Sequence, residues 1–166
     1  MKKRLLFLVV PVFFLLACTV SNTPTSKVEA LLSKYQKVDN EIKTEIENML
    51  EEQNLTETQK ERYKKILEKQ YKNLTYQIKD EQVDGDIALV TVEIEVLDLK
   101  NSIDNLVFDT SVYTKQAYDE EKLNRLESVK NKVKYTMELT VEKDEQGTWK
   151  IKNLTNDKIK KIQGMY

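Results

Sequence analysis

The stretch 76–96, YQIKDEQVDGDIALVTVEIEV, decides the fold of this chain. Tyr76 and Ile78 alternate with polar residues, and Asp84-Gly85 is a dipeptide typical of tight hairpin turns. Beyond the turn, apolar residues recur at every second position, which places them all on one face of a strand. They are Ala88, Val90, Val92, Ile94 and Val96. The stretch therefore predicts an antiparallel hairpin with one buried face.

The same alternation returns near the C-terminus at Val133, Tyr135, Met137, Leu139 and Val141. A turn is expected after it, because Gly147 supplies the positive φ that a hairpin loop needs. A last strand carrying Trp149 and Ile151 follows, and Thr155 is the expected N-cap of a short closing helix. These patterns predict a second hairpin and a C-terminal helix.

Before the first hairpin, apolar residues recur every three or four positions, the spacing of an amphipathic helix. They are Val28, Leu31, Leu32, Tyr35, Val38, Ile42, Ile46, Met49 and Leu50. One long helix from Lys27 to about Gln53 is therefore expected. Thr56 with Gln59 three residues later matches a capping box, and it predicts a second helix packed back on the first.

Helical spacing also returns between the two hairpins, in two groups around the polar connection 109–121. The groups are Ile103, Leu106 and Val107, then Leu123, Leu126 and Val129. One or two short helices are expected there. The whole order predicts an α+β domain, with two N-terminal helices packed on a curved antiparallel sheet of about four strands.

The first residues have the organisation of an export signal. Met1 to Arg4 are basic, and the apolar run 5–16 is too short to cross a bilayer, which takes about 20 residues. The run ends in Leu15, Leu16, Ala17 and Cys18, which resembles the lipobox of bacterial lipoproteins, although Leu16 is larger than usual there. The resemblance implies a signal peptide over 1–17 and a Cys18 that carries diacylglycerol and palmitate-like acyl chains. The alternative is an ordinary secretory signal with a chance cysteine.

Residues 18–26 are expected to form the lipidated cysteine and a flexible tether, because 19–26 is polar and has no apolar pattern. Eight tether residues could hold a domain at most roughly 25 Å from the headgroups. Residues 27–166 are long enough for one domain with one core. We therefore expect the protein on the outer face of the cell membrane, held by Cys18.

Composition narrows the possible functions. Removing Lys2, Lys3 and Arg4 from 27 basic residues leaves 24 against 28 acidic residues, a net charge of −4 for the mature chain. Strong nucleic-acid binding is not expected, because it needs a clustered excess of Lys and Arg. The chain has no His, and Cys18 is its only Cys. We therefore expect no metal, no cofactor and no cysteine nucleophile.

The order of elements, the strand 147–151 (GTWKI) and a chain end with Gly164 and a terminal Tyr resemble the cone-shaped roll of the NTF2-like superfamily. In particular, the chain is similar over roughly residues 26–166 to lipid-anchored bacterial proteins with this NTF2-like (cystatin-like cone) domain. The resemblance implies the fold but no single activity, because the superfamily holds isomerases, hydratases, transport factors and binding modules.

NTF2-like enzymes can combine a Tyr hydroxyl with an Asp base in a conical pocket. The resemblance therefore makes pocket candidates of Tyr76, Tyr113, Tyr118, Tyr135 and Trp149. A simpler interpretation stands beside it: Tyr76 and Tyr135 fall on the apolar side of strands, where a tyrosine usually belongs to the core. Trp149 is likewise expected to be a core anchor. The residues alone thus identify no catalytic group.

Three other patterns have a structural and a functional interpretation. The carboxylates of Asp80, Asp84 and Asp86 suggest either a calcium loop or a charged hairpin turn, and the turn is favoured because the full ligand spacing is missing. Three Asn-Leu-Thr triplets match a glycosylation acceptor but fit element boundaries better; they begin at Asn54, Asn73 and Asn153. An acidic face could meet a basic partner or simply be solvated; it carries Glu93, Glu95, Glu138 and Glu142.

Two functions remain open. The first is a non-enzymatic binding or interaction module for a small ligand, a cell-wall polymer or another envelope protein. The second is a small isomerase-like or hydrolytic enzyme with a Tyr/Asp pocket in the NTF2-like cone. The absence of His, of a usable Cys and of a Gly-rich phosphate loop favours the first.

Overall fold

The computed structural model describes residues 22–152 and 154–166. Its elements are α1 (Pro24–Lys37), α2 (Asn40–Glu51), α3 (Glu57–Lys72), β1 (Thr75–Asp84), β2 (Ile87–Leu97), α4 (Leu99–Ile103), α5 (Lys115–Ser128), β3 (Lys132–Lys143), β4 (Trp149–Ile151) and α6 (Asn156–Ile162). The strands form one antiparallel sheet in the order β1-β2-β3-β4. The predicted α+β class and four-stranded sheet are confirmed.

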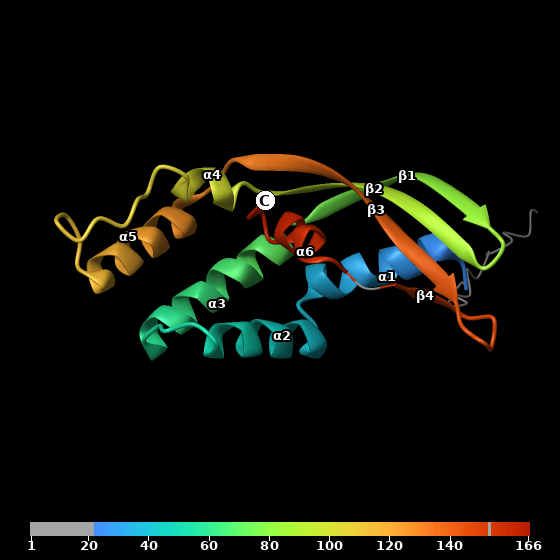
Figure 1. Cartoon of the computed structure of the whole chain (residues 1–166), viewed down its shortest axis with the longest axis horizontal. Helices are drawn as coiled ribbons and strands as arrows, with labels where there is room; N and C mark the ends of the chain where they lie inside the picture. Colours follow the sequence, from blue (N-terminus) through green and yellow to red (C-terminus); the bar gives the residue numbers. More distant parts are fainter. Residues whose placement is uncertain (1–21, 153) are drawn as a thin grey trace, which may run out of the picture.

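The first hairpin follows the sequence pattern. Every second residue of β2 is buried from Ala88 to Val96, and Gly85 has a φ of +59° in the two-residue turn before it. The second hairpin turns at Gly147, with a φ of +74°. The buried face of the sheet rests on α1, which contacts all four strands, and the strands bend over this helix (Figure 1).

The predicted single helix 27–53 is two helices, so three helices precede the sheet. α1 ends because Val38 adopts the left-handed conformation, with a φ of 48°. Asp39 then starts α2, since its carboxylate accepts a hydrogen bond from the Ile42 N–H (3.1 Å). Val38 is buried, and the burial of its side chain offsets the strain of this backbone conformation.

The folded part begins earlier than the predicted residue 27, because α1 starts at Pro24. Thr23 and Ser26 form a capping box, and Pro24 occupies the first helical turn, where its missing N–H costs nothing. The predicted signal peptide 1–17, the predicted lipobox with Cys18, and Asn153 lie outside the described residues. Within the described ranges, no helix is long and apolar enough to cross a membrane.

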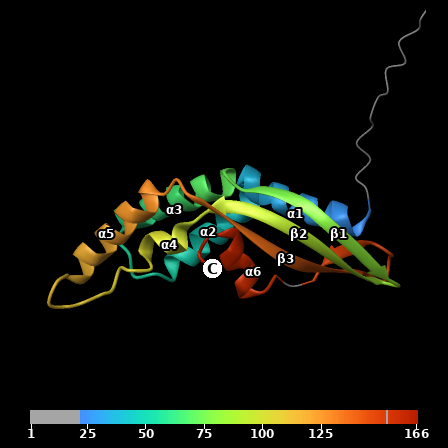
Figure 2. The same ribbon diagram turned by 90° about the horizontal axis from the view of Figure 1, so that it is seen from above.

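The connection between the hairpins holds more helix than expected. α5 begins at Lys115, inside the predicted polar connection 109–121, with Thr114 as its N-cap. α4 and α5 lie at one end of the molecule, and the turns of both hairpins lie at the other (Figures 1 and 2). The α4–α5 end has its own small apolar cluster, which shares Tyr63 with the main core. The expected single core is therefore a main cluster with a satellite.

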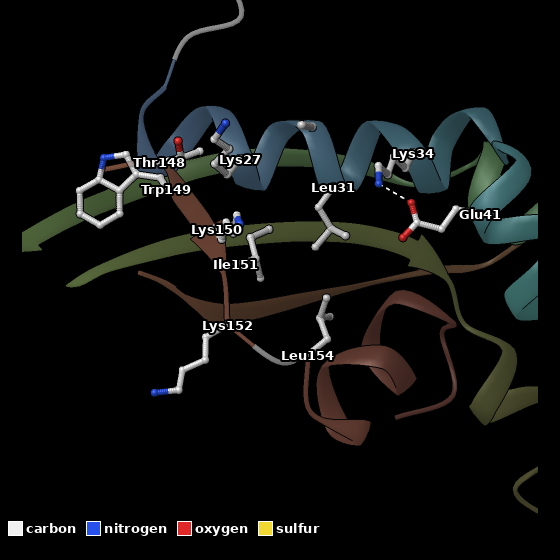
Figure 3. Close-up of a pocket in the computed structure, with 11 residues that line it drawn as sticks. Lys27, Leu31, Lys34, Glu41, Thr148, Trp149, Lys150, Ile151, Lys152 and Leu154 are labelled. Atoms are coloured by element: carbon white, nitrogen blue, oxygen red, sulfur yellow. Dashed lines mark hydrogen bonds and ion pairs between the residues drawn. The ribbon is translucent and has the colours of Figure 1, made fainter. Parts of the chain in front are cut away.

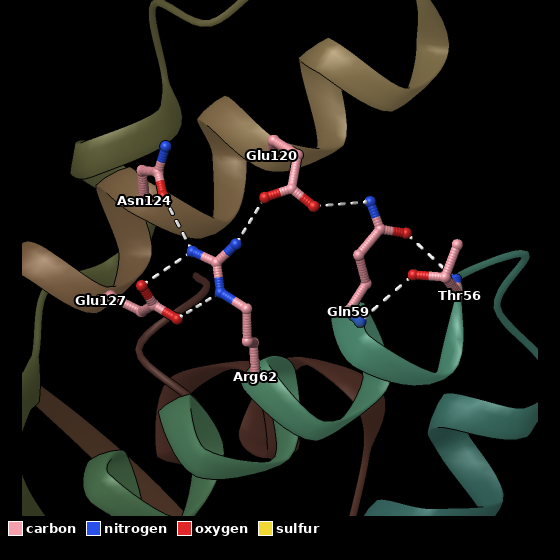
Figure 4. A network of polar contacts seen from close by, with 6 residues as sticks. All are labelled: Thr56, Gln59, Arg62, Glu120, Asn124 and Glu127. Atoms are coloured by element: carbon pink, nitrogen blue, oxygen red, sulfur yellow. Dashed lines mark hydrogen bonds and ion pairs between the residues drawn. The ribbon is translucent and has the colours of Figure 1, made fainter.

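A polar network fastens α5 to α3. The Arg62 guanidinium donates from Nε and Nη2 to both carboxylate oxygens of Glu127 (2.7 and 2.8 Å), and from Nη1 to Glu120 (2.5 Å) (Figure 4). Nη2 also donates to Asn124 (2.8 Å). Such forked contacts fix orientation as well as distance. The network therefore holds α5 in place over the small apolar cluster at this end of the molecule.

Candidate functional site

The four candidate tyrosines do not meet in one pocket. Tyr76 and Tyr135 both pair with Ile94 from opposite sides, so their backbones lie about 10 Å apart across the sheet. The Tyr135 hydroxyl donates to the backbone carbonyl of Tyr166 (3.1 Å). Tyr113 and Tyr118 instead pack edge to face at the α5 end, with centroids 6.2 Å apart. The structure thus divides the candidates between two regions.

Trp149 lies in the main core, as expected, and also borders a cleft. The cleft lies between α1 and β4 and has a volume of about 640 Å³ (Figure 3). Leu31 reaches into it from α1, Ile151 from β4 and Leu154 from the segment before α6. Three apolar side chains that converge from separate elements, in a volume of this size, are typical of a small-ligand site.

Basic side chains surround these apolar residues. The lysines that line the cleft are Lys27, Lys34, Lys150 and Lys152. Lys34 is paired with Glu41, Lys150 with Asp144 (2.9 Å) and Lys152 with Glu142 (2.6 Å). Lys27 forms no ion pair with any residue in the described ranges. Its ammonium group is therefore the cation of the cleft that remains available to an anionic ligand.

The outer edge of β4 also faces away from the rest of the sheet. The Lys152 N–H donates to the Thr140 carbonyl (2.9 Å). With this register, the backbone N–H and C=O groups of Lys150 point toward β3, and those of Trp149 and Ile151 point outward. Asn22 partly covers this edge: its side chain accepts from the Trp149 N–H (3.0 Å) and donates to the Gly147 carbonyl (3.1 Å). Asn22 is thus held at the Trp149 end of the cleft, a contact without a local sequence signal.

A tyrosine–carboxylate pair does exist, although at residues that the sequence did not single out. Tyr35 of α1 hydrogen-bonds Glu45 of α2, and burial is the main cause that raises the pKa of each. Tyr35 is 3% exposed and packs edge to face on Tyr71, with centroids 5.0 Å apart. Neither Tyr35 nor Glu45 lines the α1–β4 cleft. The pair ties two helices together rather than facing a ligand.

The remaining candidate patterns have structural roles. Asp86 pairs with Lys143 (3.2 Å), and Asp80 accepts a hydrogen bond from Gln82 (2.9 Å), next to the hairpin turn. No cluster of three metal-ligating side chains occurs in the part of the chain that the structure describes. Two of the Asn-Leu-Thr triplets mark element ends, since Thr56 caps α3 and Asn73 ends it.

The predicted acidic face is crossed by lysines from neighbouring strands. Glu93 lies between Lys79 and Lys134, at 3.4 Å from each, and Glu95 pairs with Lys132 (3.3 Å). Cross-strand pairs of this kind neutralise a sheet surface. Glu142 also pairs with Lys152 (2.6 Å), so lysines partly neutralise three of the four glutamates of this face.

Comparison of the chain with protein-family models, with curated proteins and with solved structures found no match. The α1–β4 cleft is therefore identified as the candidate functional site from its geometry alone.

Proposed function

We propose that this protein is a lipid-anchored, extracytoplasmic binding module without catalytic activity, and that its ligand occupies the α1–β4 cleft. The ligand would have an apolar body and an anionic group. One observation carries this proposal: Leu31, Ile151 and Leu154 converge from three elements beside Lys27, which has no ion-pair partner within the described residues. Apolar walls with a few placed polar groups are what a small-ligand site needs.

The proposed fold family is the NTF2-like roll. Its support is that the antiparallel sheet bends over α1 and that this helix contacts every strand. The enzyme alternative has less support. Its candidate tyrosines are divided between two regions, and the Tyr35–Glu45 pair links two helices outside the cleft, with the Tyr35 side chain buried.

Acylation at Cys18 is tested by metabolic labelling with an alkyne fatty acid. The wild-type protein is expected to take up the label, and Cys18→Ala is expected to lose all of it, because the thiol is the only attachment point in the lipobox. Thr19→Ala is the matched control and should keep the label. A labelled Cys18→Ala protein, or an unlabelled wild type, would contradict the proposed anchor.

The ligand is tested by native mass spectrometry of the full acylated protein, extracted gently from its own membranes. A retained small-molecule mass is expected for the wild type. Leu31→Asp should reduce its occupancy about tenfold or more, because a carboxylate then meets both the apolar body and the anionic group. Val112→Asp, at a residue 68% exposed on the far end, should leave occupancy unchanged. A clean wild-type mass would contradict a small-ligand site and favour a polymer or protein partner.

A further inference from the structure

Asn22, the first residue that the structure describes, is held against the outer edge of β4. Its side chain pairs with the Gly147 carbonyl and the Trp149 N–H on the outer edge of β4, as a neighbouring strand would do. Thr148 and Trp149 are at the same time lining residues of the cleft. The first described residue and one end of the cleft are therefore side by side.

The position of Asn22 limits how far Cys18 can lie from this end of the cleft. Only three residues separate Cys18 from Asn22. Four Cα–Cα steps reach at most about 14 Å, against roughly 25 Å for the eight residues expected from the sequence. An acylated Cys18 would consequently hold the Trp149 end of the cleft close to the lipid headgroups.

Resting on the proposed anchor and cleft, we infer that the cleft opens beside the bilayer and that its ligand is an anionic lipid of the same membrane. The apolar side chains of Leu31, Ile151 and Leu154 would contact the acyl part of such a lipid. Lys27 lies in the first turns of α1, within a few residues of Asn22, and would contact the headgroup phosphate. A lipid could contact both the apolar side chains and the ammonium group of the cleft, whereas free phosphate could contact only the ammonium group.

The surface of the same end supports this orientation. Val83 and Ile87, beside the turn of the first hairpin, are 53% and 51% exposed. This hairpin lies next to the start of α1, where Thr25 donates to the Glu81 carboxylate from its N–H (2.8 Å) and its hydroxyl (2.6 Å). Exposed apolar side chains next to an acyl anchor add contact area with the interfacial region of a bilayer.

The orientation is tested on the full acylated chain in phosphatidylcholine vesicles that contain headgroup-nitroxide lipid. With Cys18 acylated, a single introduced cysteine carries the fluorophore: Gln146→Cys in the β3–β4 turn, or Thr110→Cys in the distal connection as control. Both positions are exposed. Quenching several-fold stronger at 146 than at 110 is expected. Equal quenching in protein that stays on the vesicles would overturn the orientation and leave the anchor intact.

The ligand class is tested by native mass spectrometry after incubation in vesicles with and without phosphatidylglycerol. The wild type should retain phosphatidylglycerol in preference to phosphatidylcholine, and so should Lys130→Gln, which changes an exposed lysine that forms no ion pair with any described residue. Lys27→Gln should weaken this retention roughly tenfold. Equal retention of both lipids, or displacement by millimolar inorganic phosphate, would overturn the lipid assignment. A different ligand retained in the cleft would do the same, yet would leave the proposed binding function standing.

Discussion

Gly164→Ala is expected to lower the free energy of unfolding by about 3–5 kcal/mol and the unfolding midpoint by roughly 10 °C. Gly164 follows α6 with a φ of +67°, and its carbonyl accepts a hydrogen bond from the Lys100 N–H (2.8 Å). A Cβ at this position would lie well inside 3.0 Å from the Leu97 carbonyl oxygen and 2.6 Å from Gln70 Nε2. The backbone at the end of β2 must therefore move to accept it.

The matched control is Gly85→Ala. Gly85 has a similar φ of +59°, but a Cβ there meets nothing within 4 Å. Gly85→Ala should therefore lower the free energy of unfolding only by the conformational strain of an alanine at positive φ, about 1–2 kcal/mol. Thermal unfolding of the two variants, followed by circular dichroism, separates the effect of backbone strain from the effect of a steric clash. Equal losses would mean that the contact between the C-terminal segment and β2 is not as close as described.

Gln70→Leu is expected to lower the free energy of unfolding by about 2–5 kcal/mol, because it leaves two buried backbone groups without partners. Gln70 is fully buried, and its Oε1 accepts from the Leu97 N–H (3.0 Å) while its Nε2 donates to the Ile162 carbonyl (3.2 Å). One side chain of α3 thereby joins the end of β2 to the end of α6. Urea unfolding measures the loss, and a loss below about 1 kcal/mol would contradict this joining role.

Gln70→Glu adds a pH dependence that Gln70→Leu lacks. The glutamate can still accept from Leu97, but as a carboxylate it cannot donate to Ile162. Burial should raise its pKa in the folded state above the unfolded value of about 4.3. Stability is then low at neutral pH and recovers as the pH falls through the raised folded-state pKa. Relative to wild type, Gln70→Leu should show a deficit that stays constant over the same pH range.

The strands could be predicted because their signal is local. The period of two residues in 88–96 and 133–141 requires one face to be buried, and the structure buries that face. Turn positions followed from Gly85 and Gly147, and the capping box at Thr56 located the start of α3. Each of these features depends on residues within one element.

The helix boundaries that were missed lack such a signal. Tyr35, Val38 and Ile42 keep helical spacing across the break between α1 and α2, so periodicity alone hides it. The left-handed residue there is Val rather than Gly or Asn. The first turns of α5 carry Tyr118 and the buried Asp119 in place of an apolar repeat, so the sequence predicts a polar connection there. In both places tertiary packing overrides the local pattern.

The candidate site could not be predicted from the sequence. Leu31 continued the apolar stripe of a helix, and more than 100 residues separate it from Ile151 and Leu154. Asn22 belonged to the expected tether, and nothing nearby indicated its partners at Gly147 and Trp149. Only the packing of α1 against the short strand β4 brings these residues together.

The most direct test of the proposed binding function is a crystal structure of the acylated protein, purified in mild detergent from its own membrane. The account predicts elongated electron density between Leu31, Ile151 and Leu154, with its polar end within about 3 Å of Lys27 Nζ. Ligand density elsewhere on the protein, with the α1–β4 cleft filled only by water, would contradict it.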